Sequence, residues 1–340
     1  MATRRLTRRD LVGKVIDVHS HAGIHLKAAA DIGFPYCASV EDLYYRQRTN
    51  GVDVSAVFPL FPLLFFDIHA YLETGRLTPH PRPISRCPFE RENRLLLTDV
   101  YVFCPELSDR FLPFVCVDPG RMVKEQLDAV RELEAEFPIY GVKVNPVACQ
   151  SPVTELLGPG EPLFEFCAAR NWPVLFHVAV SQGEEFSQAA DTFRVIEAHP
   201  ELRYCLAHCI GLHEGFIRRA DASPNVWVDT SALKIQVELA YQRSPLMALP
   251  PDALHADLSD HVAVMRTLVE RYPRTIVWGT DAPFHSYIDR RLQGAGTYAE
   301  FRLKGTHEQE VAAWRGLTPE QQRHVNLNTL EFLFGPTDLA

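Results

Sequence analysis

The sequence lacks the features that mark membrane proteins and nucleic-acid-binding proteins. Its mostly apolar stretch from Val54 to Phe66 is interrupted by Pro59 and Pro62 and is shorter than the roughly 18 residues that cross a bilayer. Positive charge is also in deficit, with 34 Lys and Arg against 43 Asp and Glu and a net charge of -9. A nucleic-acid surface needs a basic stripe to neutralise phosphates. We therefore expect no membrane partner and no nucleic-acid partner.

The sequence also lacks a cysteine framework. Its eight cysteines include no Cys-x-x-Cys pair, and without a secretory signal they are interpreted as reduced thiols. The arginines between Arg4 and Arg9 are followed by Asp10 and Lys14 instead of an apolar segment, so a twin-arginine export signal is not predicted. Internal repeats and low-complexity segments are absent. We therefore predict a cytoplasmic globular protein.

Short β-rich runs recur along the chain, each followed by a longer polar or amphipathic stretch. This alternation is typical of parallel strands joined by helices, and 340 residues suit one barrel of that kind. We therefore predict an α/β fold, a (β/α)₈ TIM barrel, as a single domain over residues 1–340. The eight runs are Val15–Val18, Val54–Phe58, Phe111–Val117, Tyr140–Val144, Pro173–Val178, Tyr204–His208, Val226–Thr230 and Thr275–Trp278.

The spacing of the runs breaks once, between the second and the third. About fifty residues separate them, including an insertion over about 60–100. Loops of this length usually have a function. We expect the insertion to be an active-site lid or an oligomer contact, and the second role would suit a homodimer. A simple ordered surface insertion is the alternative.

Histidines and other reactive side chains fall at the ends of the predicted strands. His19 and His21 end the first run, and because strand side chains alternate they project to the same face. Lys143, His177 and His208 lie on the fourth, fifth and sixth runs, and Asp281 follows the eighth. In a TIM barrel these strand ends meet at one mouth, where active sites are built. The pattern therefore predicts a metal site with proton carriers around it.

Five sequence segments resemble the amidohydrolase superfamily, and more narrowly its amidohydrolase-2 branch of metal-dependent hydrolases and aminocarboxymuconate-semialdehyde and resorcylate type decarboxylases. The likeness extends from 15 to 335 and weakens in the insertion. A closing segment, Asn326 to Gly335, also resembles this branch. The five segments are Asp-x-His-x-His at 17–21, Gly-Val-Lys-Val-Asn-Pro at 141–146, Phe-His at 176–177, Ala-His-Cys-Ile-Gly at 207–211 and Trp-Gly-Thr-Asp-Ala-Pro-Phe at 278–284.

The resemblance implies a role for each of these residues. His19, His21, His177 and Asp281 would bind one divalent ion, for which Zn²⁺ is the default and Mn²⁺ or Fe²⁺ are alternatives. Asp281 would take a proton from a metal-activated water, and His208 would polarise the substrate or shuttle a proton. Lys143 would contact the substrate or, if carboxylated, bridge a second metal.

Two reactions on a small-molecule substrate fit this site, and a third interpretation involves no reaction. Hydrolysis of an amide, ester or lactone is favoured, because the Gly-Val-Lys strand is more typical of the hydrolases of the branch. Nonoxidative decarboxylation of an aromatic or unsaturated acid is the alternative, and it needs a cation such as Arg82, Arg86, Arg290 or Arg291 to hold the acid. A barrel that binds a ligand without turnover is the third. Candidate substrate-binding residues follow the aspartate: Phe284, His285 and Tyr287.

Overall fold

All eight β-rich runs form parallel strands. The computed structural model describes residues 4–23, 39–181, 183–285, 288–292, 299–303 and 305–336, with the backbone alone given for 288–292 and 299–303. Tyr287 therefore lies outside the described residues. The strands are β1 (Ile16–His21), β2 (Val54–Phe58), β3 (Phe111–Pro113), β4 (Val115–Val117), β5 (Val142–Val144), β6 (Val174–Phe176), β7 (Tyr204–Leu206), β8 (Val226–Asp229) and β9 (Ile276–Val277).

The strands form two parallel sheets, which follow chain order as β1-β2-β3 and β4-β5-β6-β7-β8-β9. The predicted third run is divided between them, because β3 pairs with β2 while β4 pairs with β5. Pro113 has no N–H to donate, and the N–H of Phe114 still bonds to Val57 O at 2.9 Å. On the other side, Val18 N bonds to Trp278 O at 3.1 Å, so the first and last strands of the series also meet.

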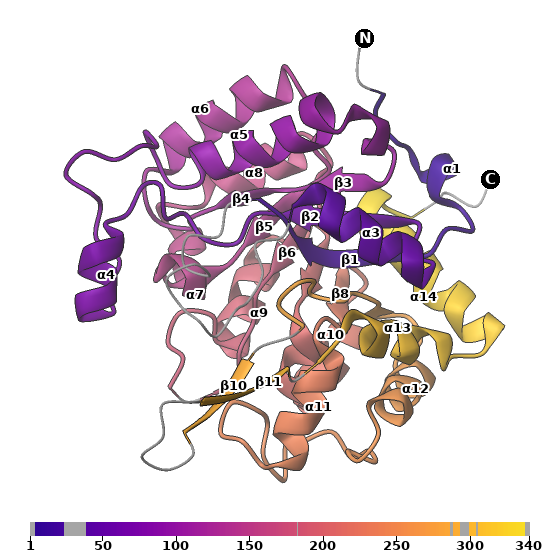
Figure 1. Ribbon diagram of the computed structural model, residues 1–340. Helices are drawn as coiled ribbons and strands as arrows, with labels where there is room; N and C mark the ends of the chain where they lie inside the picture. Colours follow the sequence, from indigo (N-terminus) through magenta and orange to yellow (C-terminus); the bar gives the residue numbers. More distant parts are fainter. Residues whose placement is uncertain are drawn as a thin grey trace.

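Helices follow most strands and cover the outside of the sheets (Figure 1). Local signals set several of their ends: the Asp260 side chain caps α12, and Thr318 and Gln321 form a capping box at α14. The described helices are α1 (Arg8–Leu11), α3 (Val40–Asn50), α4 (Ile68–Thr74), α5 (Glu90–Thr98), α6 (Val123–Glu134), α7 (Pro146–Cys149), α8 (Pro162–Ala168), α9 (Ala189–Ala198), α10 (Glu214–Asp221), α11 (Leu233–Tyr241), α12 (His261–Arg271), α13 (His307–Arg315) and α14 (Pro319–Phe334), with short turns η1 (Asp99–Phe103), η2 (Pro105–Leu107), η3 (Val153–Leu157) and η4 (His208–Leu212).

Side-chain alternation along the strands separates two apolar layers. One face of the strands contributes residues such as Phe58, Cys116 and Leu175 to a cluster that also includes Phe332. The opposite face contributes Val57 and many others to the larger cluster shared with the helices. Buried side chains on both faces of every strand are typical of a parallel sheet covered by helices. The seven described cysteines are buried and free.

The chain between β2 and β3 contains its own small apolar cluster. Leu63, Phe65, Phe66 and Leu77 pack together, while α5 returns to the barrel and contacts η1 and α6. The excursion is attached to the barrel by polar contacts, since the Gln150 side chain accepts from Leu77 N at 2.8 Å. In Figure 1, α4 lies at the edge of the molecule, away from α5 and α6. The role of the insertion over about 60–100 as a lid or an oligomer contact stays a prediction.

One element was not expected from the sequence. An antiparallel hairpin, β10 (Ile288–Leu292) and β11 (Ala299–Leu303), follows the last strand of the barrel. In the parts of the chain that the structure describes, no helix is both long and apolar enough to span a membrane.

Candidate metal centre

Three of the predicted ligands converge at the point where β1 meets the loop after β9. His19, His21 and Asp281 are all buried, and their ligand atoms lie within 4.8 Å of one another. Nε2 of His19 and Nε2 of His21 each lie 3.2 Å from Oδ1 of Asp281. Two imidazoles and a carboxylate aimed at a common point form a donor set that a divalent ion accepts.

Backbone irregularities aim these side chains. The pairing of β1 with β2 shifts between Asp17 and Ser20, which is a β-bulge of the kind found beside active sites. Across the seam, Asp281 N bonds to His19 O at 2.7 Å. Gly279 permits this approach, since a Cβ there would lie 2.8 Å from His19 Cβ. The first strand and the last loop therefore hold each other in register at the site.

Asp229, at the end of β8, orients His19. Its Oδ2 lies 2.8 Å from His19 Nδ1, and both residues are buried. A carboxylate can only accept, so Nδ1 carries the proton and Nε2 of a neutral His19 keeps its lone pair facing His21 and Asp281. Such outer carboxylates fix the tautomer of metal-binding histidines. Sequence analysis missed Asp229, although it ends a predicted strand as the other site residues do.

His208 is held in a hydrogen-bonded chain that also ends on Asp229. Ser231 Oγ lies 2.5 Å from Asp229 Oδ1 and 2.9 Å from His208 Nδ1. Because the hydroxyl donates to the carboxylate, it accepts from His208 Nδ1–H. Nε2 of His208 is then an acceptor, 3.0 Å from Nδ1 of His177. His177 is thus paired with His208 and falls outside the three-residue group, so its role as a metal ligand stays a prediction.

The charge states in the site follow from burial and from these pairs. Burial raises the pKa of Asp281, but the hydrogen bonds and charge of His19 outweigh it and hold the pKa well below its ordinary value. Burial lowers the pKa of His21 to about 3 and also lowers the pKa of His208. For His19, burial and Lys143 lower the pKa, yet Asp229 and Asp281 produce a net rise. The site therefore combines an ionised carboxylate with neutral His21 and His208.

Both predicted catalytic residues, His208 and Asp281, adopt the left-handed backbone conformation. Asp281 has φ 61°, and His208 begins a turn in which φ stays positive through Leu212. Residues other than glycine pay for this conformation, and such strain is typical of functional sites. Gly211 within the turn is also needed sterically, since a Cβ would lie 2.6 Å from Val180 Cγ2.

The remaining predicted residues take different positions. Lys143 is buried with Nζ 3.4 Å from His19 Nε2, and burial lowers its pKa to about 8. Asp17 accepts from His19 N and from the Thr280 hydroxyl. Phe284 contacts the His21 ring edgewise at 5.1 Å. His285 is buried against His307.

A cavity of 610 Å³ opens onto the cluster. It reaches His19, His21 and Asp281, together with Lys143, His177, His208 and Phe284, whereas His285 is not among its lining residues. The excursion between β2 and β3 contributes Leu60, Phe61 and Tyr71. The volume is that of a small-molecule site, so the cluster is accessible to a substrate.

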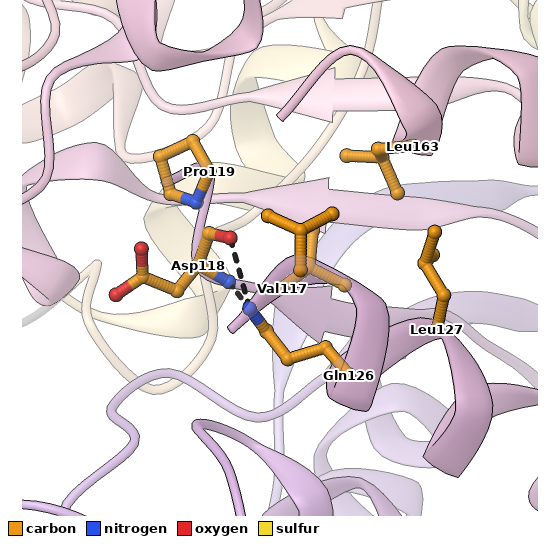
Figure 2. Close-up of a pocket in the computed structure, with 7 residues that line it drawn as sticks. Val117, Asp118, Pro119, Gln126, Leu127 and Leu163 are labelled. Carbon is orange, nitrogen blue, oxygen red and sulfur yellow. Dashed lines mark hydrogen bonds between the residues drawn. The ribbon is translucent and has the colours of Figure 1, made fainter. Parts of the chain in front are cut away.

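A second hollow, beside the end of β4, is a packing feature (Figure 2). The Gln126 side chain pairs with Asp118 N at 2.8 Å and Asp118 O at 3.1 Å, as the dashed lines show. The hollow has no room for a water molecule. Its polar groups serve to attach α6 to the end of β4.

The fold and the cluster define a TIM-barrel protein with a candidate metal site of His and Asp side chains. The chain belongs to the amidohydrolase family, whose model matches residues 88–325 and so includes His177, His208 and Asp281. A search of curated protein sequences found no match.

Solved structures confirm the predicted barrel. A TIM-barrel protein from Bordetella bronchiseptica is 15% identical, covers 95% of this chain and 100% of its own, and has a TM-score of 0.58. An amidohydrolase from Burkholderia multivorans with bound zinc is 14% identical, covering 95% and 99%, with a TM-score of 0.58. The apo IDCase of Metarhizium anisopliae is 13% identical, covering 95% and 98%, with a TM-score of 0.51.

The residues present fit a divalent metal. Nε2 of His19 and Nε2 of His21 each lie 3.2 Å from Asp281 Oδ1, and Asp229 holds the proton of His19 on Nδ1, so these atoms present lone pairs to the same point. His19, His21 and Asp281 would hold the ion, with His177 beside them in the same cavity.

Proposed function

We propose that the protein is a metal-dependent hydrolase that cleaves an amide, ester or lactone bond in a small molecule, with one divalent ion, Zn²⁺ by default. The observation that carries this proposal is the cluster of His19, His21 and Asp281 at the floor of an open cavity. When bound, the ion would lower the pKa of a water molecule and polarise a carbonyl oxygen.

The protein's own groups supply the proton chemistry. Asp281 is ionised and points into the cluster, so its carboxylate can accept a proton from the attacking water. His208 is neutral with Nε2 as an acceptor, because Ser231 fixes its proton on Nδ1. The proton that Asp281 receives has to reach the leaving group, and the same Nε2 can carry it there once His208 exchanges its hydrogen bond to His177 for one to the substrate. Lys143, close to His19, adds a donor that can orient the substrate.

The decarboxylase alternative needs a cation that holds the substrate acid. Among the described residues that line the cavity, Lys143 is the one Lys or Arg side chain. Arg86 instead pairs with Glu90 and Glu132 at the surface, and Arg82 is not in the lining. The side chains of Arg290 and Arg291 lie outside the described residues. Among the described residues, Lys143 is therefore the side chain that would have to hold the acid in a decarboxylase.

The test uses protein stripped with a chelator and reloaded with one equivalent of Zn²⁺. Both forms are assayed for hydrolysis of p-nitrophenyl esters, anilides and lactones, and for CO₂ release from hydroxybenzoates. We expect hydrolysis that depends on zinc. Release of CO₂ without hydrolysis would establish the decarboxylase instead, and failure to take up zinc would favour a barrel that binds without turnover.

A further inference from the structure

The wall of the cavity above the cluster is predominantly apolar. More than half of its lining residues have apolar or aromatic side chains, and they come from the segments after β2, β5, β6, β8 and β9. These segments surround the mouth, whereas the polar ligands lie together at the floor. The principal wall residues are Leu60, Phe61, Phe186, Ile235, Leu239 and Phe284.

Helix α11 contributes two apolar side chains to this wall. Ile235 and Leu239 are four residues apart and so share one helix face, and both line the cavity. The wall continues past the helix to Leu246, which lines the cavity although it is 58% exposed. Leu246 therefore extends the apolar lining of the cavity from α11 toward solvent.

The wall also lacks charge in the part of the chain that the structure describes. Lys143 is its one cation, and it lies at the floor against His19. Apart from the histidines, the other polar side chains of the lining are the amides Asn145, Gln150 and Gln236 and the phenol of Tyr71, which can donate hydrogen bonds but offer no positive charge. An anionic group far from the scissile bond would therefore be desolvated without an ion pair.

We infer that the substrates of this site carry a bulky, uncharged acyl or aryl group that occupies the apolar wall while their carbonyl faces His19, His21 and Asp281. This inference rests on the proposed function and adds the substrate class. A cavity of 610 Å³ is large for an acetyl group and suits a medium-chain or aromatic one.

The test measures the affinity of straight-chain acyl hydroxamates from acetyl to octanoyl by calorimetry, for zinc-loaded and metal-free protein. Each methylene buried against the wall should tighten Kd about fourfold, equivalent to about 0.8 kcal/mol. The dependence of Kd on chain length reports on the wall, and the difference between the two forms reports on the metal. A chain-length dependence without a metal effect would sink the proposed function but would still show that the apolar wall binds the acyl chain.

Three results would overturn the inference. One is a Kd that does not change with chain length in the zinc-loaded protein. Another is tighter binding of succinic monohydroxamate than of butyrohydroxamate, since it would show that the wall accepts an anion. The third is the absence of hydroxamate binding in both forms of the protein.

Two matched variants test whether the effect of chain length on Kd arises at the wall formed by α11. Leu239→Gln places an amide in the wall and should weaken octanohydroxamate binding about fifteenfold, the loss of roughly two methylene contacts. Leu249→Gln is the control, because Leu249 is 45% exposed and does not line the cavity. Equal weakening in both variants would contradict the assignment of α11 to the wall.

Discussion

The contact between Asp229 and His19 allows a sharp test of how the site prepares its ligands. In Asp229→Asn, the oxygen acceptor should stay at the Oδ1 position, because that position accepts from His208 N and Ser231 N at 3.0 Å each. The new amide NH₂ then faces His19 Nδ1. His19 can accept this hydrogen bond only by moving its proton to Nε2, the atom that faces Asp281.

The magnitude follows from this tautomer change. A protonated Nε2 has no lone pair for a metal, so the proton of His19 must return to Nδ1 before the metal binds. The Nδ1–H group then faces the N–H of the new amide, and neither can accept. Loss of such an outer partner typically costs 10- to 100-fold in metal affinity, or about 1.4 to 2.7 kcal/mol. We expect the Kd for Zn²⁺ to rise within that range.

The assay is a competition titration of Zn²⁺ against a chromogenic chelator, with circular dichroism to confirm that the variant is folded. Ser231→Ala is the matched control, because it removes the link to His208 but leaves the bond between Asp229 and His19. It should keep the zinc affinity within about twofold while lowering kcat. Unchanged zinc affinity in Asp229→Asn, or equal losses in both variants, would refute the reasoning.

Three further predictions concern separate parts of the molecule. His208→Ala should abolish turnover while retaining zinc, whereas His19→Ala should lose both, as measured by elemental analysis alongside activity; equal metal loss would support two metals. Gly279→Ala should weaken zinc binding, because its Cβ would displace His19; an unaltered titration would contradict this. Burial raises the pKa of Glu92 from 4.5 to about 7, so the native protein holds a proton that the unfolded chain releases, and stability falls as pH rises through this window. Gln does not titrate, so the free energy of unfolding of Glu92→Gln should rise relative to that of the native protein by about 3 kcal/mol from pH 4.5 to pH 7. Urea unfolding at the two pH values measures this change, and a difference that stays constant would disprove it.

The strands could be predicted from the sequence because a buried parallel strand consists of a short run rich in β-branched residues, and helical stretches separate these runs. Each of the eight runs forms a strand, and the rule that strand ends share one mouth brings His19, His21 and Asp281 together. The rule could equally have identified Asp229, but a single Asp at a strand end has no partner visible in the sequence. Only the fold shows that it reaches His19.

Other features depend on contacts between distant segments and leave no local signal. The break at Phe114 arises because β3 and β4 pair with different neighbours. The left-handed turn from His208 contains mostly residues that rarely adopt positive φ, so propensity predicts the opposite. The excursion between β2 and β3 was recognised as unusual from its length, but its contribution to the cavity follows from tertiary packing.

The seam between β1 and the loop after β9 has a consequence for the life of the protein in a cell. His21 and Asp281 are separated by 260 residues, so a ribosome working at about 5 to 20 residues per second makes the last ligand roughly 13 to 52 s after the first pair. During that interval the chain has His19 and His21, and later His177, but it lacks the carboxylate. If the site holds a metal ion, tight binding has to wait until synthesis has passed Asp281, and a chain that terminates earlier would bind the ion more weakly.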